Sequence, residues 1–487
     1  MRQQRTIYFN DARHYYLFVF EPPMTMKDAW VPVDEVAGTA VDTFCYGVAR
    51  GDGLYYPSKV GHLFADDMET FEQAAYWRAW HCMKSLMDRG LDPLKVLIDR
   101  SHEKGMEFIA SLRMTVHAKM KAEHRLEQGG GGLGHEEVRD HQFAVLQELT
   151  NDYDTDGIEL DFALPGGGPR VLREQDVPAM TPVMTEYVRD IAKMVRGRSS
   201  NPGFVGARVL PTEQMNLDQG LDVRTWLKEG LLDFVVPIRY GYMILDPNLP
   251  MDWLIDAAHD ADTSVYPVLQ PYVRDPSTGN ASERTWPTPQ QMRATVANYW
   301  SRGADGMYAW FMRWPLGDVE RSILTELGDP DLVMEADKHY VMALNPLNRD
   351  EPHYELHLPV EMRIEDAGRR HPIPFYIADD IEGSADRIRE VILRLRVYDL
   401  VSDDRISILL NGRSLEDETC RRAVYSHINA YGGQWLEFDL QHVMPRKGEN
   451  LLEVALEKRA DRLVSSLKVD EMEIQVQYGP YPSRLRW

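Results

Sequence analysis

The chain has 487 residues, of which 44% are hydrophobic and 27% charged, so it can bury a large core and form more than one domain. Its 77 acidic and 54 basic residues give a formal net charge of −23, which disfavours nucleic acid and anionic membranes as partners. The three cysteines, Cys45, Cys82 and Cys420, lie far apart and have no metal-type spacing, so neither a disulfide framework nor a zinc site is expected.

The hydrophobic residues are not arranged for membrane insertion. No apolar run approaches the roughly 20 residues that span a bilayer, and the opening MRQQRTIYFND lacks the apolar core of a signal peptide. We therefore expect a cytoplasmic protein, or a periplasmic or secreted one if a signal peptide has been removed.

From Thr6 to about Leu327, short strand-like runs alternate with amphipathic helical stretches. Eight such units in about 330 residues predict a closed (β/α)₈ barrel, also called a TIM barrel, over residues 1–335; an open doubly wound sheet is the alternative. The predicted strands are 6–10, 41–48, 107–114, 157–162, 204–209, 234–239, 264–270 and 306–311, and the clearest predicted helices are 70–88, 136–152, 182–197 and 289–303.

After about Asp337, period-two runs separated by turn residues replace the strand–helix alternation. This pattern predicts an antiparallel β-sandwich over residues 345–487, which would be an accessory or carbohydrate-binding module. A linker is expected at NPLNRDEP (345–352). The predicted strands are 389–400, 404–415, 434–440, 449–458 and 470–479.

The fourth predicted barrel strand, in DGIELDF (156–162), carries two acidic residues on one face. Glu159 and Asp161 are two positions apart, so both point the same way, roughly 6.6 Å apart along the strand. A buried carboxylate is costly unless it is paired or has a catalytic task. One interpretation is therefore a structural ion pair with Arg113 or Arg239, and the other is an active site.

The active site of a (β/α)₈ barrel lies at the carboxyl ends of its strands, so residues at these ends are candidates for function. They combine carboxylates for acid–base chemistry with cations and with aromatic rings that stack on sugars. Glu213 could instead be a surface acid and His117 a structural histidine. The candidates are Asn10, Asp11, Tyr46, Arg113, His117, Glu159, Asp161, Glu213, Arg239, Tyr240, Trp310 and Trp314.

The glycine-rich segment GGGGLG (129–134) formally contains the dinucleotide-binding pattern GxGxxG. It does not directly follow a predicted strand, so a loop over the barrel mouth is the simpler interpretation, and an oxidoreductase that binds a nicotinamide cofactor is a third alternative. The histidines show no HExxH or paired spacing, so no metal and no cofactor are expected.

Several short motifs together resemble a group of bacterial glycoside-hydrolase-like barrel proteins that carry a C-terminal sandwich. DGIELD is similar to the DGxxxD form of some α-glucosidase-like and α-galactosidase-like barrels, which implies that Asp161 is the nucleophile. Chitinase-like barrels carry DxxDxDxE on this strand, and Ala163 replaces its final Glu here, which argues against their substrate-assisted chemistry. The motifs are TIYFND (6–11), SLRMTVH (111–117), DGIELDF (156–162), DFVVPIRY (233–240) and GADGMYAWF (303–311).

The resemblance implies a glycoside hydrolase that acts on an oligo- or polysaccharide. Such enzymes pair one carboxylate as acid with another as nucleophile or base. We expect Asp161 in the second role, with Glu159 or Glu213 as the acid. A non-catalytic carbohydrate-binding barrel is the main alternative, because a fold does not by itself determine function. The oligomeric state stays open.

Overall fold

The computed structural model describes residues 2–11, 17–50, 53–114, 119–126, 132–163, 171–198, 202–239, 243–275, 283–343, 353–423 and 433–479. The chain forms two compact units. The first comprises Met1–Tyr240, Pro250–Leu269 and Gly303–Gly328, and the second comprises Gly241–Leu249, Gln270–Arg302 and Asp329–Trp487.

The main sheet of the first unit is parallel, and it closes into a barrel. Its strand order is β10-β13-β1-β2-β5-β6-β7-β8-β9. The two edge strands, β9 and β10, are separated by only two residues, so one continuous stretch pairs with β8 on one side and with β13 on the other. The strands are β1 (Arg5–Asp11), β2 (Thr43–Gly47), β5 (Glu107–Arg113), β6 (Gly157–Asp161), β7 (Phe204–Val209), β8 (Phe234–Pro237), β9 (Ser264–Val265), β10 (Val268–Leu269) and β13 (Gly306–Ala309).

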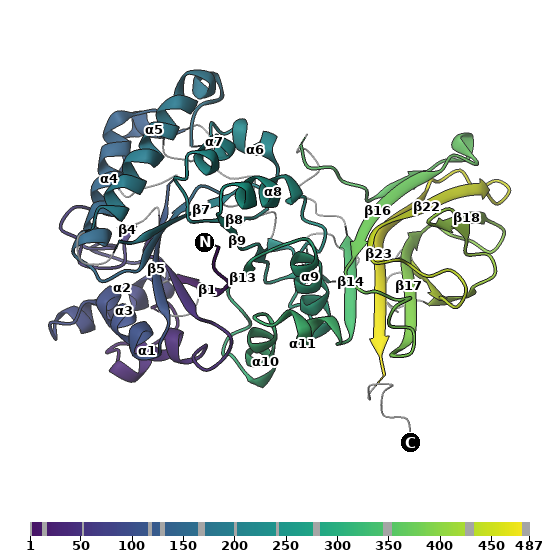
Figure 1. Ribbon diagram of the computed structural model, residues 1–487, viewed down its shortest axis with the longest axis horizontal. Coiled ribbons are helices and arrows are strands. Elements are labelled where there is room, and N and C mark those ends of the chain that lie inside the picture. Colours follow the sequence, from purple (N-terminus) through teal and green to yellow (C-terminus); the bar gives the residue numbers. More distant parts are fainter. Residues whose placement is uncertain are drawn as a thin grey trace. The chain divides into compact units, whose positions relative to one another are not determined.

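Helices of the first unit surround these strands (Figure 1). Several begin at recognisable caps: Asp92 accepts hydrogen bonds from the backbone amides of Leu94 and Lys95 at the start of α3, and Thr25 forms a capping box with Asp28 in α1. The helices are α1 (Met26–Asp34), α2 (Ala74–Met87), α3 (Pro93–Glu103), α4 (Glu136–Asn151), α5 (Val177–Arg196), α6 (Glu213–Leu217), α7 (Val223–Lys228), α8 (Asp252–Asp260) and α10 (Asp318–Glu326), and a short hairpin joins β3 (Ala49–Arg50) to β4 (Gly53–Leu54).

The amino-terminal half of the barrel interior is filled by aromatic and ion-paired side chains. Gly206 on β7 has no side chain because the ring of Phe234 on β8 occupies its place; an added Cβ would lie 1.9 Å from that ring. Nearby, the Arg5 guanidinium pairs with the Glu107 carboxylate at 2.6 Å. This half of the barrel interior is therefore filled by side chains. A catalytic or binding site is expected at the carboxyl ends of the strands.

The second unit contains a two-sheet antiparallel sandwich. One sheet has the order β14-β23-β17-β21-β20, with β15 also paired to β23, and the other has the order β16-β22-β18-β19. Helices α9 (Pro289–Ser301) and α11 (Pro330–Met334) and the hairpin of β11 (Val273–Arg274) and β12 (Arg284–Thr285) belong to the same unit. The sandwich strands are β14 (Lys338–Ala343), β15 (Val360–Met362), β16 (His371–Ile377), β17 (Ile388–Tyr398), β18 (Arg405–Leu410), β19 (Arg413–Ser414), β20 (Thr419–Ala423), β21 (Gln434–Asp439), β22 (Gly448–Lys458) and β23 (Leu467–Tyr478).

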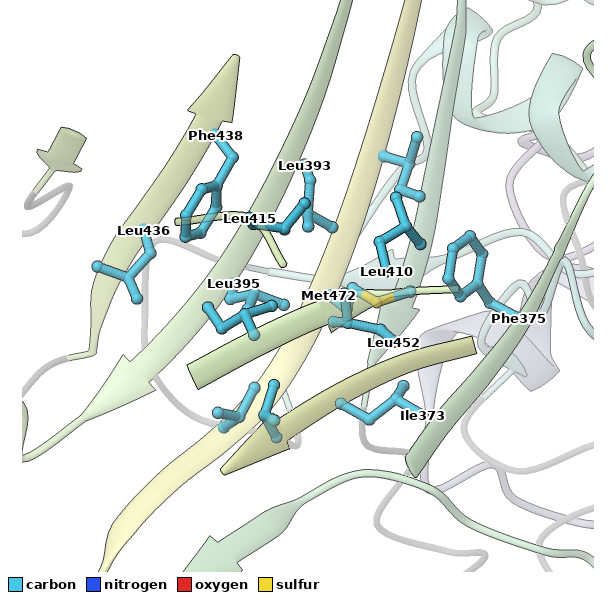
Figure 2. Packing of buried hydrophobic residues seen from close by; sticks show 14 of the residues in the cluster. Ile373, Phe375, Leu393, Leu395, Leu410, Leu415, Leu436, Phe438, Leu452 and Met472 are labelled. Atoms are coloured by element: carbon cyan, nitrogen blue, oxygen red, sulfur yellow. The ribbon is translucent and has the colours of Figure 1, made fainter. Parts of the chain in front are cut away.

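The sandwich core forms where the inward side chains of the two sheets meet. Figure 2 shows Leu393 and Leu395 of β17 among residues contributed by the opposite sheet, such as Leu410 and Leu452. Alternate residues of β17 are buried, as a strand with one core face requires. The β18–β19 turn at Asn411-Gly412 has positive φ at both residues, 52° and 79°, as a type I′ hairpin turn requires.

The predicted fold class, a TIM barrel followed by an antiparallel sandwich, is confirmed. The two compact units do not coincide with the expected domains, because residues 270–302 and strand β14 join the second unit. Whether 1–335 and 345–487 are independent domains stays a prediction. Within the described residues, no helix combines the length and apolar character needed to cross a membrane.

Candidate active site

Glu159 and Asp161 share the inner face of β6, and a single cation lies between them and the rest of the barrel. This cation is Arg208, the residue that pairs with Asp161 in the β6–β7 register. Its Nη2 lies 2.5 Å from Glu159 Oε1, and its Nη1 lies 3.2 Å from Asp161 Oδ2. All three side chains are almost completely buried. The two carboxylates are therefore joined through one guanidinium.

Both oxygens of Glu159 are engaged. The Ser111 hydroxyl donates to Oε1 at 2.9 Å, beside the Arg208 contact, and the Tyr308 hydroxyl donates to Oε2 at 2.8 Å. The Cys45 thiol lies 3.6 Å from the same Oε2. Burial raises the pKa of Glu159 above its ordinary value, and the positive charge of Arg208 opposes this rise. Glu159 is thus enclosed by donors.

Arg208 is held between aromatic rings. Its Cζ lies 4.4 Å from the ring centre of Phe9, 5.1 Å from Tyr308 and 4.9 Å from Trp310. Burial alone would lower the pKa of Arg208, but the charges of Asp161 and Glu159 outweigh it and keep that pKa well above its ordinary value. The guanidinium is consequently a fixed and permanent charge.

Asp161 is the last residue of β6 and differs from Glu159 in one respect. Its Oδ2 accepts a hydrogen bond from Arg208, whereas its Oδ1 is buried and has no hydrogen-bond partner within the described part of the chain. A buried, unpartnered carboxylate oxygen costs free energy in the resting protein. At the carboxyl end of a barrel strand it marks a position where a ligand atom could bind.

Asp11 and Arg113 extend the charged row on the same inner face. Asp11 ends β1 and Arg113 ends β5, and their charged groups are 3.5 Å apart. Gly47, on the intervening β2, leaves this path open, because a Cβ there would lie 2.7 Å from the Cβ of Asp11. Arg113 is also the register partner of Asp161.

The structure brings together Asp11, Arg113, Glu159, Asp161 and Trp310. Trp310 is almost fully buried and meets the Phe9 ring edge-on at 5.3 Å. His117 and Tyr240, which were also expected at the rim, lie outside the described residues.

Other candidates lie elsewhere. Asn10 and Tyr46 alternate with the inward-facing Phe9 and Cys45, so they point to the outer face of the sheet. Trp314 lies beyond the barrel strands and packs against Phe20. The buried Arg239 follows the end of β8 by two residues.

Glu213 is not part of this cluster. It begins the short helix α6, and its carboxylate forms a two-point ion pair with Arg224 of α7, at 2.5 and 2.8 Å. This hydrogen-bonded pair lowers the pKa of Glu213, which favours the charged form rather than a proton donor.

Sequence reasoning missed Arg208, Ser111, Tyr308 and Cys45 as members of the cluster. For Arg208, the sequence did contain a signal. Side chains of a strand alternate between its two faces, so in FVGARV (204–209) Arg208 lies on the same face as Gly206. Within the part of the chain that the structure describes, no three His, Cys, Asp or Glu side chains are arranged to hold a metal ion.

No protein-family model matches the sequence, and no curated protein matches it. Among solved structures, the chain is similar to a Paenibacillus sp. cycloisomaltooligosaccharide glucanotransferase complexed with cycloisomaltoheptaose (9% identity, TM-score 0.34, 96% of this chain and 57% of that chain). It is also similar to α-L-fucosidase isoenzyme 2 from Paenibacillus thiaminolyticus (13%, 0.42, 69% and 50%) and to an α-L-fucosidase from Vibrio sp. strain EJY3 (10%, 0.42, 97% and 96%).

The chain spans only 57% and 50% of the lengths of the two Paenibacillus proteins. At these low identities and TM-scores, the likenesses assign no activity.

Proposed function

We propose that the protein is a glycoside hydrolase acting on an oligo- or polysaccharide, with Asp161 as its nucleophile or base. One observation supports this best: Asp161 ends a barrel strand with one oxygen held by Arg208 and the other unpartnered among the described residues. A carboxylate in this state is oriented, yet has an oxygen left for a sugar carbon or a water molecule.

The aromatic rings around Arg208 suit the same task. Phe9 and Trp310 shield the guanidinium from water, which strengthens its interaction with Asp161. The cluster therefore combines apolar rings with a fixed charge, and both features are common where proteins bind and cleave sugars.

Glu159 is less suited to be the acid than we expected from the sequence. Arg208, Ser111 and Tyr308 all donate to it, so it has little freedom to pass a proton to a substrate. We assign it instead to positioning, since it fixes Arg208, which in turn orients Asp161. Glu213 is paired with Arg224, so we do not propose it as the acid.

The test is a survey of polysaccharides and aryl glycosides with the wild-type protein, followed by Asp161→Asn. Turnover by the wild type and a loss of roughly three orders of magnitude or more in kcat for a folded Asp161→Asn variant would support the proposal. Glu213→Gln is the matched control and should retain nearly full activity. An active Asp161→Asn variant would refute the assignment of Asp161.

A non-catalytic carbohydrate-binding barrel is the second candidate. It is favoured by the fact that Arg208 pairs with both Glu159 and Asp161, as a purely structural ion network would. This candidate predicts sugar binding without turnover across the whole substrate survey. It also predicts that Asp161→Asn lowers the unfolding free energy, because Arg208 would lose one of its two buried counter-charges.

A further inference from the structure

We infer that the groove between helices α4 and α5, on the outside of the barrel, is a docking site for a partner protein. The partner inserts an amphipathic helix whose apolar stripe is flanked by basic residues. This inference does not depend on the proposed hydrolase function, because the groove is built by helices and the candidate active site by strands.

The groove is formed by one face of each helix, and the two helices lie side by side (Figure 1). Its lining runs from Glu136 to Asn151 on α4 and from Val183 to Gly197 on α5, and in each helix the lining positions recur three or four residues apart. At the rise of an α-helix, these segments are about 20 Å long. The space between them is about 800 Å³. The groove is therefore long enough for about four turns of a third helix.

Apolar side chains lie along the groove. Phe143 of α4 and Val183 and Met194 of α5 are half-buried, and the buried Tyr187 of α5 lies among the lining residues. The Tyr187 hydroxyl donates to the backbone carbonyl of Arg139 at 3.1 Å, so the polar atom of this ring is already satisfied. Covering such side chains with those of a partner removes apolar surface from water and favours binding.

A helix fits this groove better than an extended peptide does. An extended peptide needs backbone partners such as the edge of a sheet, but both walls here are helices, whose backbone groups are paired internally. An inserted helix satisfies its own backbone and presents apolar side chains at i, i+3 or i+4, and i+7. This is the spacing at which α4 and α5 present their lining residues.

The charges along the groove favour a basic occupant. Within the described residues, the carboxylates of Glu136, Asp140 and Asp190 have no ion-pair partner, and Lys193 is the single lining cation in the same state. The acids lie on both walls, Glu136 and Asp140 on α4 and Asp190 on α5. Basic residues on either side of an apolar stripe would therefore each meet an acid.

The other charged residues of the lining already have partners. Glu186 pairs with Arg189, Arg139 donates to the Leu133 carbonyl, and Arg198 donates to the Thr155 carbonyl. The unpaired charge is thus mainly negative. A second copy of this chain, with its net charge of −23, would be repelled, whereas a basic partner is attracted and associates faster.

The test measures the binding of labelled synthetic peptides to the full chain by fluorescence anisotropy at about 0.15 M salt. The probe is a helical peptide of about 15 residues, the length of the groove, with Leu on one face and Lys on both flanks. One control peptide has the same residues in an order that spreads Leu around the helix, and the other has Glu in place of Lys. We expect the probe to bind roughly tenfold or more tightly than either control.

Variants locate the binding. Phe143→Ser should weaken the probe about fivefold or more, because it removes an apolar contact in the groove. Asp140→Asn/Asp190→Asn should weaken it about three- to tenfold and reduce its salt dependence. Asp256→Asn/Asp260→Asn is the matched control, since it removes the same charge from two exposed aspartates of α8, and it should stay within about twofold of the wild type.

Equal binding of the probe and the reordered peptide would overturn the inference, as would equal losses in the groove variant and the α8 variant. In either case the attraction would reflect the overall charge of the chain. Sedimentation of the protein alone is a further check, because self-association that Phe143→Ser abolishes would mean that a second copy fills the groove, and the inference would be wrong. If Phe143→Ser does not fold, the double aspartate variant, which changes only exposed side chains, decides the matter.

Discussion

Arg208 is the residue on which the site depends, and Glu159 is its main support. Glu159→Gln should keep an acceptor oxygen for Ser111 and Arg208, but it removes the charge that fixes Arg208 and places an N–H donor opposite the Tyr308 hydroxyl, which would then have to accept. We expect kcat to fall roughly tenfold or more while KM changes little, because Glu159 acts through Arg208 rather than on the substrate. Steady-state kinetics on one good substrate measures both values. A rise in KM at unchanged kcat would contradict a positioning role.

A second prediction at this scale concerns Glu35, which follows α1. Burial raises the pKa of Glu35 to about 8, against the hydrogen bond from Trp314, which lowers it. The folded state therefore binds this proton more tightly than the unfolded state. The contribution of this proton to the free energy of unfolding is fully present below about pH 4.5 and is lost as the pH rises through about 8.

Glu35→Gln mimics the protonated carboxyl group and should remove that dependence. The variant should match the wild type near pH 5 and exceed its unfolding free energy by a few kcal/mol at pH 9. Urea titrations at several pH values would show this difference. Glu213→Gln provides the comparison with a half-buried carboxylate that is ion-paired to Arg224. If the unfolding free energies of the wild type and of Glu35→Gln changed with pH in parallel, the prediction of a buried, protonated Glu35 would be wrong.

At the scale of elements, the sequence predicts strands better than it predicts their partners. The eight barrel strands are apolar runs between amphipathic helices, and this local pattern suffices to locate them. Arg208 was passed over because its partners Glu159 and Tyr308 are 49 and 100 residues away in sequence. Only the closed barrel brings these residues together, and a single sequence does not show which strand positions become neighbours.

Strand β16 shows the opposite difficulty. Its sequence HPIPFYI (371–377) contains Pro372 and Pro374, which cannot donate a backbone hydrogen bond and so disfavour the prediction of a strand. The strand forms because it lies at the edge of its sheet and pairs only with β22. Edge position is a tertiary property, and for this reason β16 was not predicted.

A buried lysine joins several elements of the second unit. Lys338 of β14 donates to Asp379 Oδ1 at 2.9 Å and to the carbonyls of Met334 and Ala336 at 2.8 and 3.0 Å. Lys338→Met would strand the buried Asp379 charge, so we expect a loss of about 3–5 kcal/mol in unfolding free energy. Urea denaturation measures it.

The double variant Lys338→Met/Asp379→Leu removes both charges and should be less destabilised than Lys338→Met alone. Tyr340 and Tyr478, which donate to Asp379, would lose an acceptor in the double variant, so a residual loss is expected. A single variant as stable as the wild type would show that this ion pair is not needed for the fold.

At the scale of the whole molecule, the residue boundaries of the second unit predict which fragments fold. Strand β14 pairs with β23 from Lys338↔Val476 to Ala343↔Glu471, and Tyr340 lies in the sandwich core. A fragment of residues 345–487 lacks this strand and leaves one edge of β23 open beyond β15.

We expect the fragment 345–487 to melt at lower temperature and to aggregate more than a fragment of residues 329–487, which retains α11 and β14. Circular dichroism melts and gel filtration of the two fragments make the comparison. Equal behaviour would mean that residues 345–487 form a complete domain, as the sequence alone suggested.

The barrel closes through pairing between β1 and β13, whose strands begin about 300 residues apart in the chain. During synthesis, β1 leaves the ribosome long before its second neighbour exists, so one edge of the growing sheet stays unpaired until residue 309 has emerged. Ribosome-bound chains that stop short of that point would expose the unpaired backbone N–H and C=O groups of β1, together with its apolar side chains such as Ile7 and Phe9, to other chains. We therefore expect chaperones to bind and protect the growing chain for most of its translation, however stable the finished barrel is.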